Sequence, residues 1–169
     1  KDLFNALGVT SIDCRQNGAK IGGQGREGYL FNSTISGIDD ADAILIVGSN
    51  PRLEAPVLNA RIRQRWLSGK CEIGLIGEAA DLTYEYDHVG TGPKELAGLA
   101  KKRSGFIKAL KDAERPMIIV GEGALAREDG AQVLRAAGDL AAKVGAVKEG
   151  WNGFNVLHTA ASRVGALDL

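Results

Sequence analysis

The sequence predicts a doubly wound α/β fold, in which helices cover both faces of a parallel β-sheet. Three short, predominantly apolar runs carry this prediction. They lie at about 43–47, 72–76 and 117–120, and helical sequence follows each of them. A strand that is buried on both faces reads as a continuous apolar run instead of an alternating one. Because the strand–helix order repeats, right-handed crossovers and parallel strands are expected.

Length and composition indicate a single globular domain. The chain has 169 residues, of which 44% are hydrophobic and 25% charged. Residues 1–37 read as an irregular, glycine-rich lead-in, and residues 38–169 as the main α/β body. The chain opens on Lys1 with what looks like a helix end closed by Gly8, and stops abruptly at Leu169. Both ends lead us to expect a fragment of a longer protein.

The charge balance argues against two classes of partner. Lysine plus arginine and aspartate plus glutamate number 21 each, so the formal net charge is zero. A nucleic-acid-binding protein usually carries a basic surplus, and none is present. No apolar run approaches the roughly 20 residues that a membrane-spanning helix needs. We therefore expect neither nucleic-acid binding nor direct insertion into a membrane.

The lead-in offers little regular structure. Residues 10–14 could form a short strand, and residues 17–37 read as a long loop with a short helical piece near 29–31. Residues 23–28 (GQGREG) match the spacing of a dinucleotide-binding fingerprint. No convincing strand precedes this match and no strong helix follows it, so it is a poor candidate for a phosphate loop.

Apolar periodicity predicts helices over 52–67, 93–101, 106–113 and 128–144. Pro56 lacks a donor N–H and must lie in a first turn, so the first helix proper should start near Ala55. The helix over 128–144 has acids at its start, Lys143 at its end and Gly145 just beyond. A last helix is expected over 155–165, with Asn155 as its cap. Its buried face would comprise Leu157, Ala160, Ala161 and Val164.

No catalytic or metal-binding group emerges from the reactive residues. Cys14 and Cys71 share no metal-ligand spacing and are interpreted as buried, reduced thiols. His88 lies in the run YEYDH and is interpreted as a loop histidine, with proton shuttling as the alternative. His158 falls in the last predicted helix and is interpreted as structural. The carboxylates form no pair whose spacing demands acid–base chemistry.

Two glycine turns at strand ends are the candidate ligand sites. Gly48, Ser49 and Asn50 follow the first strand and precede a helix, an arrangement that offers backbone donors to an anion or a ribose. Residues 121–126 (GEGALA) fit the form G-x-G-x-x-A after the third strand, although Glu122 would repel a phosphate. These spacings therefore leave open whether the chain binds a nucleotide.

The helix over 52–67 carries four arginines, and Arg61 and Arg65 share one of its faces. We interpret them as a solvated helix flank, with a docking surface for an acidic partner as the alternative. The four are Arg52, Arg61, Arg63 and Arg65.

Residues 41–51 (ADAILIVGSNP), followed by 54–63 (EAPVLNARIR), resemble the molybdopterin oxidoreductase superfamily. More narrowly, they are similar to the large iron–sulfur subunits of proton-pumping NADH:quinone oxidoreductase (respiratory complex I), known as the 75 kDa subunit in mitochondria and present in the bacterial enzyme as well. The segments 75–77, 81–90, 115–121 and 155–158 carry the same resemblance, which covers roughly residues 36–169.

The resemblance implies a Rossmann-like domain in the C-terminal part of such a subunit. It also implies that 4Fe-4S and 2Fe-2S clusters are bound upstream in the parent chain, with no cofactor in this fragment. Other peripheral-arm subunits would be the partners. The location would be peripheral, on the cytoplasmic face of a bacterial inner membrane or on the matrix side in mitochondria.

The resemblance also implies a comparison with the active molybdenum enzymes of the superfamily. In those enzymes, two segments at strand ends hold a pterin guanine dinucleotide. The first is a loop like Gly48 to Pro51, and the second is an aspartate–proline–arginine segment. Residues 77–80 (GEAA) stand in the second place here, so its acid and arginine are missing, and only Asp87 resembles a later aspartate of that pattern. A structural, non-catalytic domain is therefore expected, with Gly48, Ser49 and Asn50 as a vestigial site. The alternatives are a working domain like that of formate dehydrogenase and a plain nucleotide-binding module.

Overall fold

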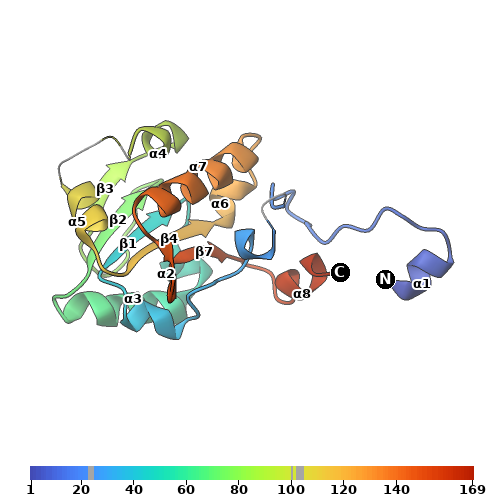
Figure 1. Cartoon of the computed structure of the whole chain (residues 1–169), viewed down its shortest axis with the longest axis horizontal. Coiled ribbons are helices and arrows are strands. Elements are labelled where there is room, and N and C mark those ends of the chain that lie inside the picture. The colour runs from blue at the N-terminus through green and yellow to red at the C-terminus, as the bar shows by residue number, and fades with distance from the viewer. Residues whose placement is uncertain (23–24, 100, 102–104) are drawn as a thin grey trace.

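The computed structural model describes residues 1–22, 25–99, 101 and 105–169. It contains a five-stranded sheet in the order β3-β2-β1-β4-β7, and all neighbouring strands run parallel (Figure 1). The predicted doubly wound α/β fold is thus confirmed. The strands are β1 Ala43–Val47, β2 Glu72–Ile76, β3 Asp87–Gly90, β4 Pro116–Gly121 and β7 Phe154–Leu157.

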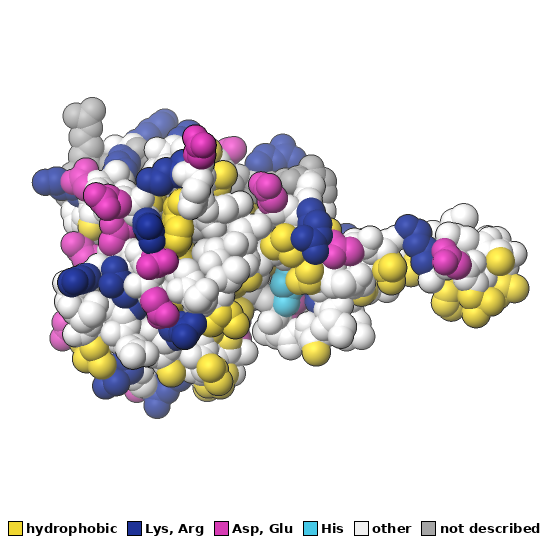
Figure 2. Space-filling view, turned by 60° about the horizontal axis from the view of Figure 1, so that its bottom comes forward, with side chains coloured by type: hydrophobic (Ala, Val, Ile, Leu, Met, Phe, Trp, Pro, Cys, Tyr) yellow, Lys and Arg dark blue, Asp and Glu magenta, His cyan; other side chains and the backbone are white. Residues whose placement is uncertain are grey.

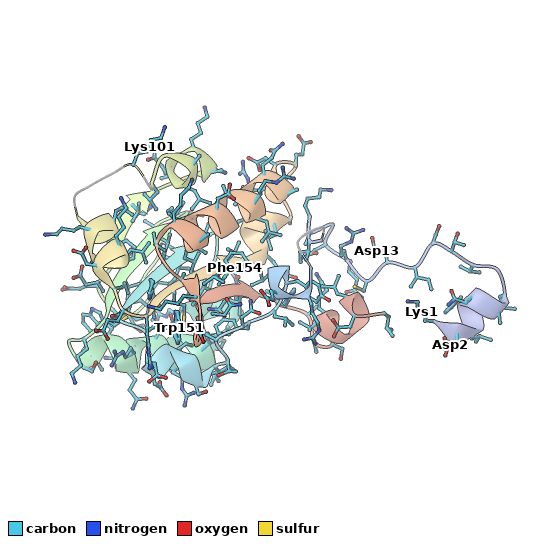
Figure 3. The ribbon with its side chains drawn as sticks, in the orientation of Figure 1. Lys1, Asp2, Asp13, Lys101, Trp151 and Phe154 are labelled. Atoms are coloured by element: carbon cyan, nitrogen blue, oxygen red, sulfur yellow. The ribbon has the colours of Figure 1, made fainter. Side chains whose placement is uncertain are left out.

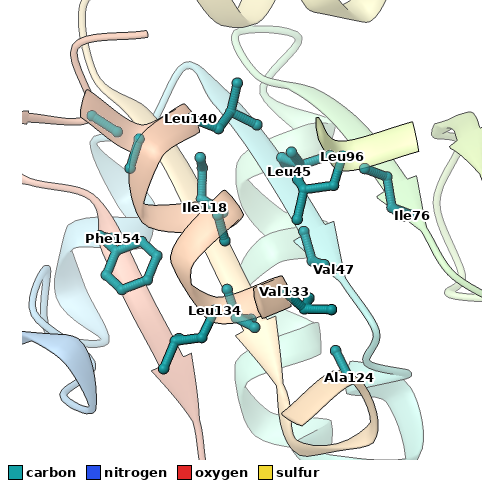
Figure 4. Packing of buried hydrophobic residues seen from close by; sticks show 14 of the residues in the cluster. Leu45, Val47, Ile76, Leu96, Ile118, Ala124, Val133, Leu134, Leu140 and Phe154 are labelled. Carbon is teal, nitrogen blue, oxygen red and sulfur yellow. The ribbon is translucent and has the colours of Figure 1, made fainter. Parts of the chain in front are cut away.

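The central strand β1 is buried on both faces, which accounts for its continuous apolar sequence. All five of its residues are buried, and alternate side chains enter two separate cores. Leu45 and Val47 face helices α4 (Pro93–Leu99), α5 (Phe106–Asp112) and α7 (Gly130–Lys143) (Figure 4). Ile44 and Ile46 face α3 (Pro56–Leu67) and the 3-10 turn η2 (Ser36–Asp39). Each face of the sheet therefore has its own hydrophobic core.

The four helices expected between residues 52 and 144 are confirmed, except that the first of them is divided in two. The helix expected over 52–67 is divided at Ala55 into α2 (Pro51–Glu54) and α3, which begins at Pro56. Ala55 is extended, with φ of −149°, because a residue before proline avoids the helical region. The helices expected at 93–101, 106–113 and 128–144 correspond to α4, α5 and α7.

The helix expected over 155–165 is wrong. Residues Phe154–Leu157 form the edge strand β7, and only the short α8 (Arg163–Leu167) follows. Asn155 is fully buried in the strand, and its Oδ1 accepts hydrogen bonds from the backbone N–H and the hydroxyl of Ser33. The side chain that resembled a helix cap is therefore the partner of a segment 122 residues away in sequence.

Other local expectations also need correction. Residues 10–14 form no strand, and the helical piece expected near 29–31 is a 3-10 turn, η1, at Arg26–Gly28. The strand β3 and the hairpin of β5 (Val147–Lys148) and β6 (Trp151–Asn152) have no counterpart in the predicted order. In the fingerprint-like run 23–28, residues 23 and 24 lie outside the described residues.

The lead-in has two differently packed parts. Residues 1–13, including α1 (Asp2–Ala6), are all exposed and extend away from the sheet, with apolar side chains at the far end (Figures 1, 2 and 3). In contrast, Ala19 and Ile21 are buried in the same core as the apolar side chains of α7. Phe31 forms an antiparallel bridge with Asn155, so the lead-in also covers the β7 edge of the sheet.

A buried ion pair ties the C-terminal segment to the sheet. Glu122 begins the short helix α6 (Glu122–Leu125) directly after β4, and its carboxylate lies 2.8 Å from the guanidinium of Arg163 in α8. Both side chains are 5% exposed or less. The hydroxyl of Thr159 donates to the same carboxylate. Within the described part of the chain, no helix is long and apolar enough to cross a membrane.

A buried thiol and a buried phenol in the core beneath α3 should make the free energy of unfolding depend on pH in the alkaline range. Burial raises the pKa of the Cys71 thiol to about 12 and also raises the pKa of Tyr84. The unfolded chain would release both protons near their ordinary pKa values of about 8.5 and 10, while the folded chain retains them. The free energy of unfolding should therefore fall between about pH 9 and 11, by up to roughly 1.4 kcal/mol per pH unit for each group.

Urea unfolding at several pH values tests this prediction. The double variant Cys71→Ala, Tyr84→Phe should show a flatter decline above pH 9 than the unmodified chain. Identical pH profiles for the two chains would contradict it. Tyr84→Phe also removes a 2.8 Å hydrogen bond to Oδ1 of Asn59, so the comparison concerns the slope and not the absolute stability.

Candidate functional site

A cleft of about 580 Å³ lies at the carboxyl ends of β1, β2 and β3. The loop after β1, the loop after β2 and the residues before α4 line it. The three predicted site residues, Gly48, Ser49 and Asn50, all face this cleft. Carboxyl ends of parallel strands are where α/β folds bind ligands, so the structure brings the predicted residues to the expected place.

Gly48 is the point at which the β1 loop packs closely against helix α6. Its φ is +60°, and a Cβ placed on it would lie 2.4 Å from the Cβ of Ala124. Strand order reverses between β1 and β4, which makes this the switch point of the sheet. Because α6 packs directly on the Gly48 backbone, a methyl group does not fit between the two strand-end loops.

The side chain of Glu54 occupies two of the donors that an anion in the β1 loop would use. Its Oε1 accepts the backbone N–H of Asn50 at 2.6 Å, and its Oε2 accepts the hydroxyl of Ser49 at 2.9 Å. Glu54 lies in α2 and reaches back to the residue that precedes the helix, much as in a capping box. An internal carboxylate thus takes the place that the sequence assigned to a phosphate or ribose.

Replacing Glu54 by alanine should destabilise this turn. Loss of a comparable cap contact costs about 1 kcal/mol of unfolding free energy. Denaturant titration would measure the loss, and Glu54→Gln, which retains an acceptor oxygen, should recover part of it. Equal stability of Glu54→Ala and the unmodified chain would contradict the role of this carboxylate as a cap.

The side chains of the loop after β2 are also unsuited to an anion. Glu78 is exposed and belongs to the cleft lining. The phenol of Tyr86 accepts the N–H of Ala80 and donates to its carbonyl, which holds the loop in place. His88 contacts the carbonyl of Gly77 at 2.8 Å through Nε2. These residues stabilise the loop and contribute a negative charge to the cleft.

Arg127 is the basic residue of the cleft lining. Its guanidinium forms two hydrogen bonds with the carboxylate of Asp129, at 2.7 and 3.1 Å. This pairing raises the pKa of Arg127 and lowers the pKa of Asp129. The charge of Arg127 is therefore largely balanced by its neighbour, while Glu54 and Glu78 face the cleft without an ion-pair partner among the described residues.

The second predicted loop, residues 121–126, does not present Glu122 to the cleft. Gly123 and Ala124 line the cleft, whereas the carboxylate of Glu122 is bound to Arg163 and Thr159. The expected repulsion between Glu122 and a phosphate therefore does not arise. The contact of α6 with Gly48 is what closes the switch point.

The arginines of α2 and α3 bind within the chain. Two form ion pairs with carboxylates and two donate to backbone carbonyls, which favours an internal role over a docking surface for an acidic partner. The contacts are Arg52–Asp81, Arg61–Asp39, Arg63 to Thr83 O and Arg65 to Ala41 O.

The remaining histidine and the two cysteines do not line the cleft. His158 follows β7 and does not lie in a helix; its Nε2 contacts the carbonyl of Tyr29 at 2.6 Å. Cys14 is half-buried and Cys71 is buried, and both thiols are free. Among the described residues, no group of three or more histidine, cysteine, aspartate or glutamate side chains could hold a metal ion.

Comparison with known proteins decides the family. The model of the family "Molybdopterin oxidoreductase" matches residues 1–169. The chain belongs to the molybdopterin oxidoreductase family. The Rossmann-like α/β architecture and the cleft at its strand ends agree with this assignment.

Curated relatives confirm the narrower resemblance. The chain is 43% identical to NADH dehydrogenase (ubiquinone) iron-sulfur protein 1, mitochondrial, of Solanum tuberosum. It is 44% and 42% identical to the NADH-ubiquinone oxidoreductase 78 kDa subunits, mitochondrial, of Neurospora crassa and Candida albicans. Each match covers 100% of this chain but only 23–24% of the relative.

The family name raises the question of whether the cleft fits a pterin dinucleotide. A diphosphate needs unpaired donors or balancing cations at the strand ends. Here Glu54 accepts the N–H of Asn50 and the hydroxyl of Ser49, and Arg127 is paired with Asp129. Glu78 adds a further negative charge. The residues present do not fit the diphosphate of such a cofactor.

Two functional features escaped sequence reasoning. Glu54 lies four residues after Asn50, one residue beyond the spacing of a capping box, so the sequence carried no clear signal for its capping role. The Glu122–Arg163 pair had no signal either, because its partners are 41 residues apart. Only the fold brings the first residue of α8 next to the first residue of α6.

Proposed function

We propose that this chain is a structural, non-catalytic domain of the iron–sulfur subunit of NADH:quinone oxidoreductase. It would support electron transfer from NADH to quinone by 4Fe-4S and 2Fe-2S clusters bound elsewhere in the parent chain. Other peripheral-arm subunits would be its partners. Its location would be the cytoplasmic face of a bacterial inner membrane or the mitochondrial matrix side.

One observation carries the non-catalytic part of this proposal. The carboxylate of Glu54 accepts the hydroxyl of Ser49 and the backbone N–H of Asn50, two of the donors that these residues would offer to a ligand. Gly48, Ser49 and Asn50 are then a vestigial site, in which a protein group has replaced the ligand as hydrogen-bond partner. The names of the relatives support the subunit assignment, since each describes an NADH dehydrogenase or NADH-ubiquinone oxidoreductase component.

The test is the cofactor content of the full-length subunit purified in its complex. Elemental analysis for molybdenum and tungsten, with fluorescence detection of oxidised pterin, should find amounts far below one per polypeptide. Asn50→Ala should leave NADH:quinone activity and assembly unchanged. Stoichiometric pterin, or loss of activity in a fully assembled Asn50→Ala complex, would overturn the proposal.

One observation favours the alternative, a working cofactor-binding domain like that of formate dehydrogenase. Oδ1 of Asn50 is buried and has no hydrogen-bond partner among the described residues, beside a cleft of about 580 Å³. A plain nucleotide-binding module would use the same atom. Titration with guanine nucleotides separates these functions: saturable micromolar binding that Asn50→Ala abolishes, without pterin in the preparation, would indicate the nucleotide module.

A further inference from the structure

Two apolar side chains beside a cleft-lining residue are exposed in the described part of the chain, and they form what we call the apolar patch. Val57 and Leu53 are 82% and 78% exposed, which makes them the most exposed large apolar side chains among the described residues. They flank Glu54 along α2 and α3, and Glu54 lines the cleft. Exposed side chains of this kind next to a concave surface indicate an interaction site.

The charge around the patch is negative and uncompensated. Both oxygens of Glu54 accept neutral donors, so its charge is not balanced by a cation. Glu78, which also lines the cleft, is exposed and forms no ion pair within the described part of the chain. Arg127 is already bound to Asp129. The cleft mouth thus favours a positively charged group that is flanked by apolar ones.

We propose that this face binds a basic, apolar segment of the parent polypeptide outside these 169 residues. A lysine or arginine of that segment would enter the cleft mouth between Glu54 and Glu78, and neighbouring apolar side chains would cover Leu53 and Val57. This inference deepens the proposed function and rests on it, because a bound pterin dinucleotide would fill the same cleft.

Chain length and patch size identify the occupant as part of the same polypeptide. The curated relatives extend far beyond the matched region, since this chain spans only 23–24% of each. A stable interface between separate proteins buries about 800 Å² on each side, more than two side chains and a cleft mouth supply. A tethered segment needs less contact area, because its effective concentration is high.

Photo-crosslinking in the full-length chain tests this inference. A benzoylphenylalanine at position 57, in the assembled complex, should crosslink to a peptide of the same polypeptide that contains lysine or arginine among apolar residues. Leu67, at the other end of α3 and 58% exposed, is the matched control position and should not give that crosslink. Crosslinks from position 57 to another subunit, or none at all, would overturn the inference.

Charge reversal provides a second readout. Glu78→Lys should lower the yield of the position-57 crosslink by about tenfold or more, because it places like charges together. Glu149→Lys, at an exposed glutamate in the β5–β6 turn, should leave the yield unchanged. Equal yields for the two variants would contradict the charge complementarity.

Pterin content measured on the same preparations separates the two proposals. A missing crosslink in pterin-free protein would contradict only the docking of the segment. Stoichiometric pterin would contradict the proposed function itself.

Discussion

Replacing Glu122 by alanine is expected to lower the free energy of unfolding by about 3–5 kcal/mol. The change leaves the guanidinium of Arg163 buried without a counter-charge, and it removes the acceptor of the Thr159 hydroxyl. The remaining contact of Arg163, a 3.2 Å bond to Oδ1 of Asn17, involves a neutral amide and cannot balance the charge. Breaking a buried pair from one side costs more than the pair itself contributes, since desolvation of the remaining charge is no longer offset.

A double-mutant cycle with Arg163→Ala measures this coupling. The double variant should be less destabilised than the sum of the single variants by about 2 kcal/mol, because it leaves no unpaired charge. Glu122→Gln, which keeps the shape of the side chain and loses its charge, should fall between Glu122→Ala and the unmodified chain. Strictly additive single losses would contradict the buried ion pair.

The exposed pair Arg26–Asp168 provides the matched control. It joins the lead-in to the end of α8, as the buried pair joins α6 to α8, and its two side chains are 60% and 32% exposed. Solvent screens such a pair, so Asp168→Ala should cost much less than Glu122→Ala. Similar losses would mean that chain connectivity, and not burial of charge, determines the effect of Glu122.

Gly48→Ala is expected to destabilise the fold by about 3 kcal/mol or more, from two additive causes. An alanine at φ of +60° is strained by itself. Its Cβ would also lie 2.4 Å from the Cβ of Ala124, 2.9 Å from its N and 3.0 Å from its Cα. Two of these three atoms belong to the α6 backbone, so the conflict is not relieved by rotating a side chain.

Gly69→Ala separates strain from crowding. Gly69 ends α3 with φ of +70°, and nothing lies within 4 Å of a Cβ placed there. Only the backbone cost of about 1 kcal/mol is therefore expected. Adding Ala124→Gly to Gly48→Ala should recover part of the loss, because it removes one of the three close atoms. A Gly48→Ala variant no less stable than Gly69→Ala would show that α6 does not pack on the β1 loop.

The stability of the Gly48 and Glu54 variants would show which contacts hold the β1 side of the cleft in place. Gly48 lets α6 close the switch point, and Glu54 holds the adjacent turn from within. Both interactions are made by the chain with itself. Such internal contacts order the strand-end loops, which agrees with the structural role proposed above.

The central strands were predictable because they are buried on both sides. β1, β2 and β4 agree with the expected 43–47, 72–76 and 117–120 to within a residue. Helix α7 was predictable for a related reason, since its apolar stripe repeats at helical spacing over four turns. The position of the candidate site followed from the same elements, because a strand-end loop is located once its strand is known.

The edge strands were not predictable from local pattern. Asp87 and His88 of β3 are exposed, so the strand lacks an apolar run. In β7, Asn155 interrupts the apolar residues and resembles a helix cap, and only its contact with Ser33 explains its burial. An edge strand has one neighbour fewer and different burial, so its sequence is less constrained than that of a central strand.

The sequence by itself thus determined the α/β class, the central sheet, most helices and the loop at which a ligand would bind. Tertiary structure alone decided what occupies that loop, because the partners of Ser49 and Asn50, and the packing of Ala124 on Gly48, depend on side-chain and backbone distances. Periodicity reports which faces are buried, since burial repeats with the geometry of the helix or strand. Hydrogen bonds and ion pairs between distant segments, such as Glu122 with Arg163, leave no periodic trace and become visible only when the chain is folded.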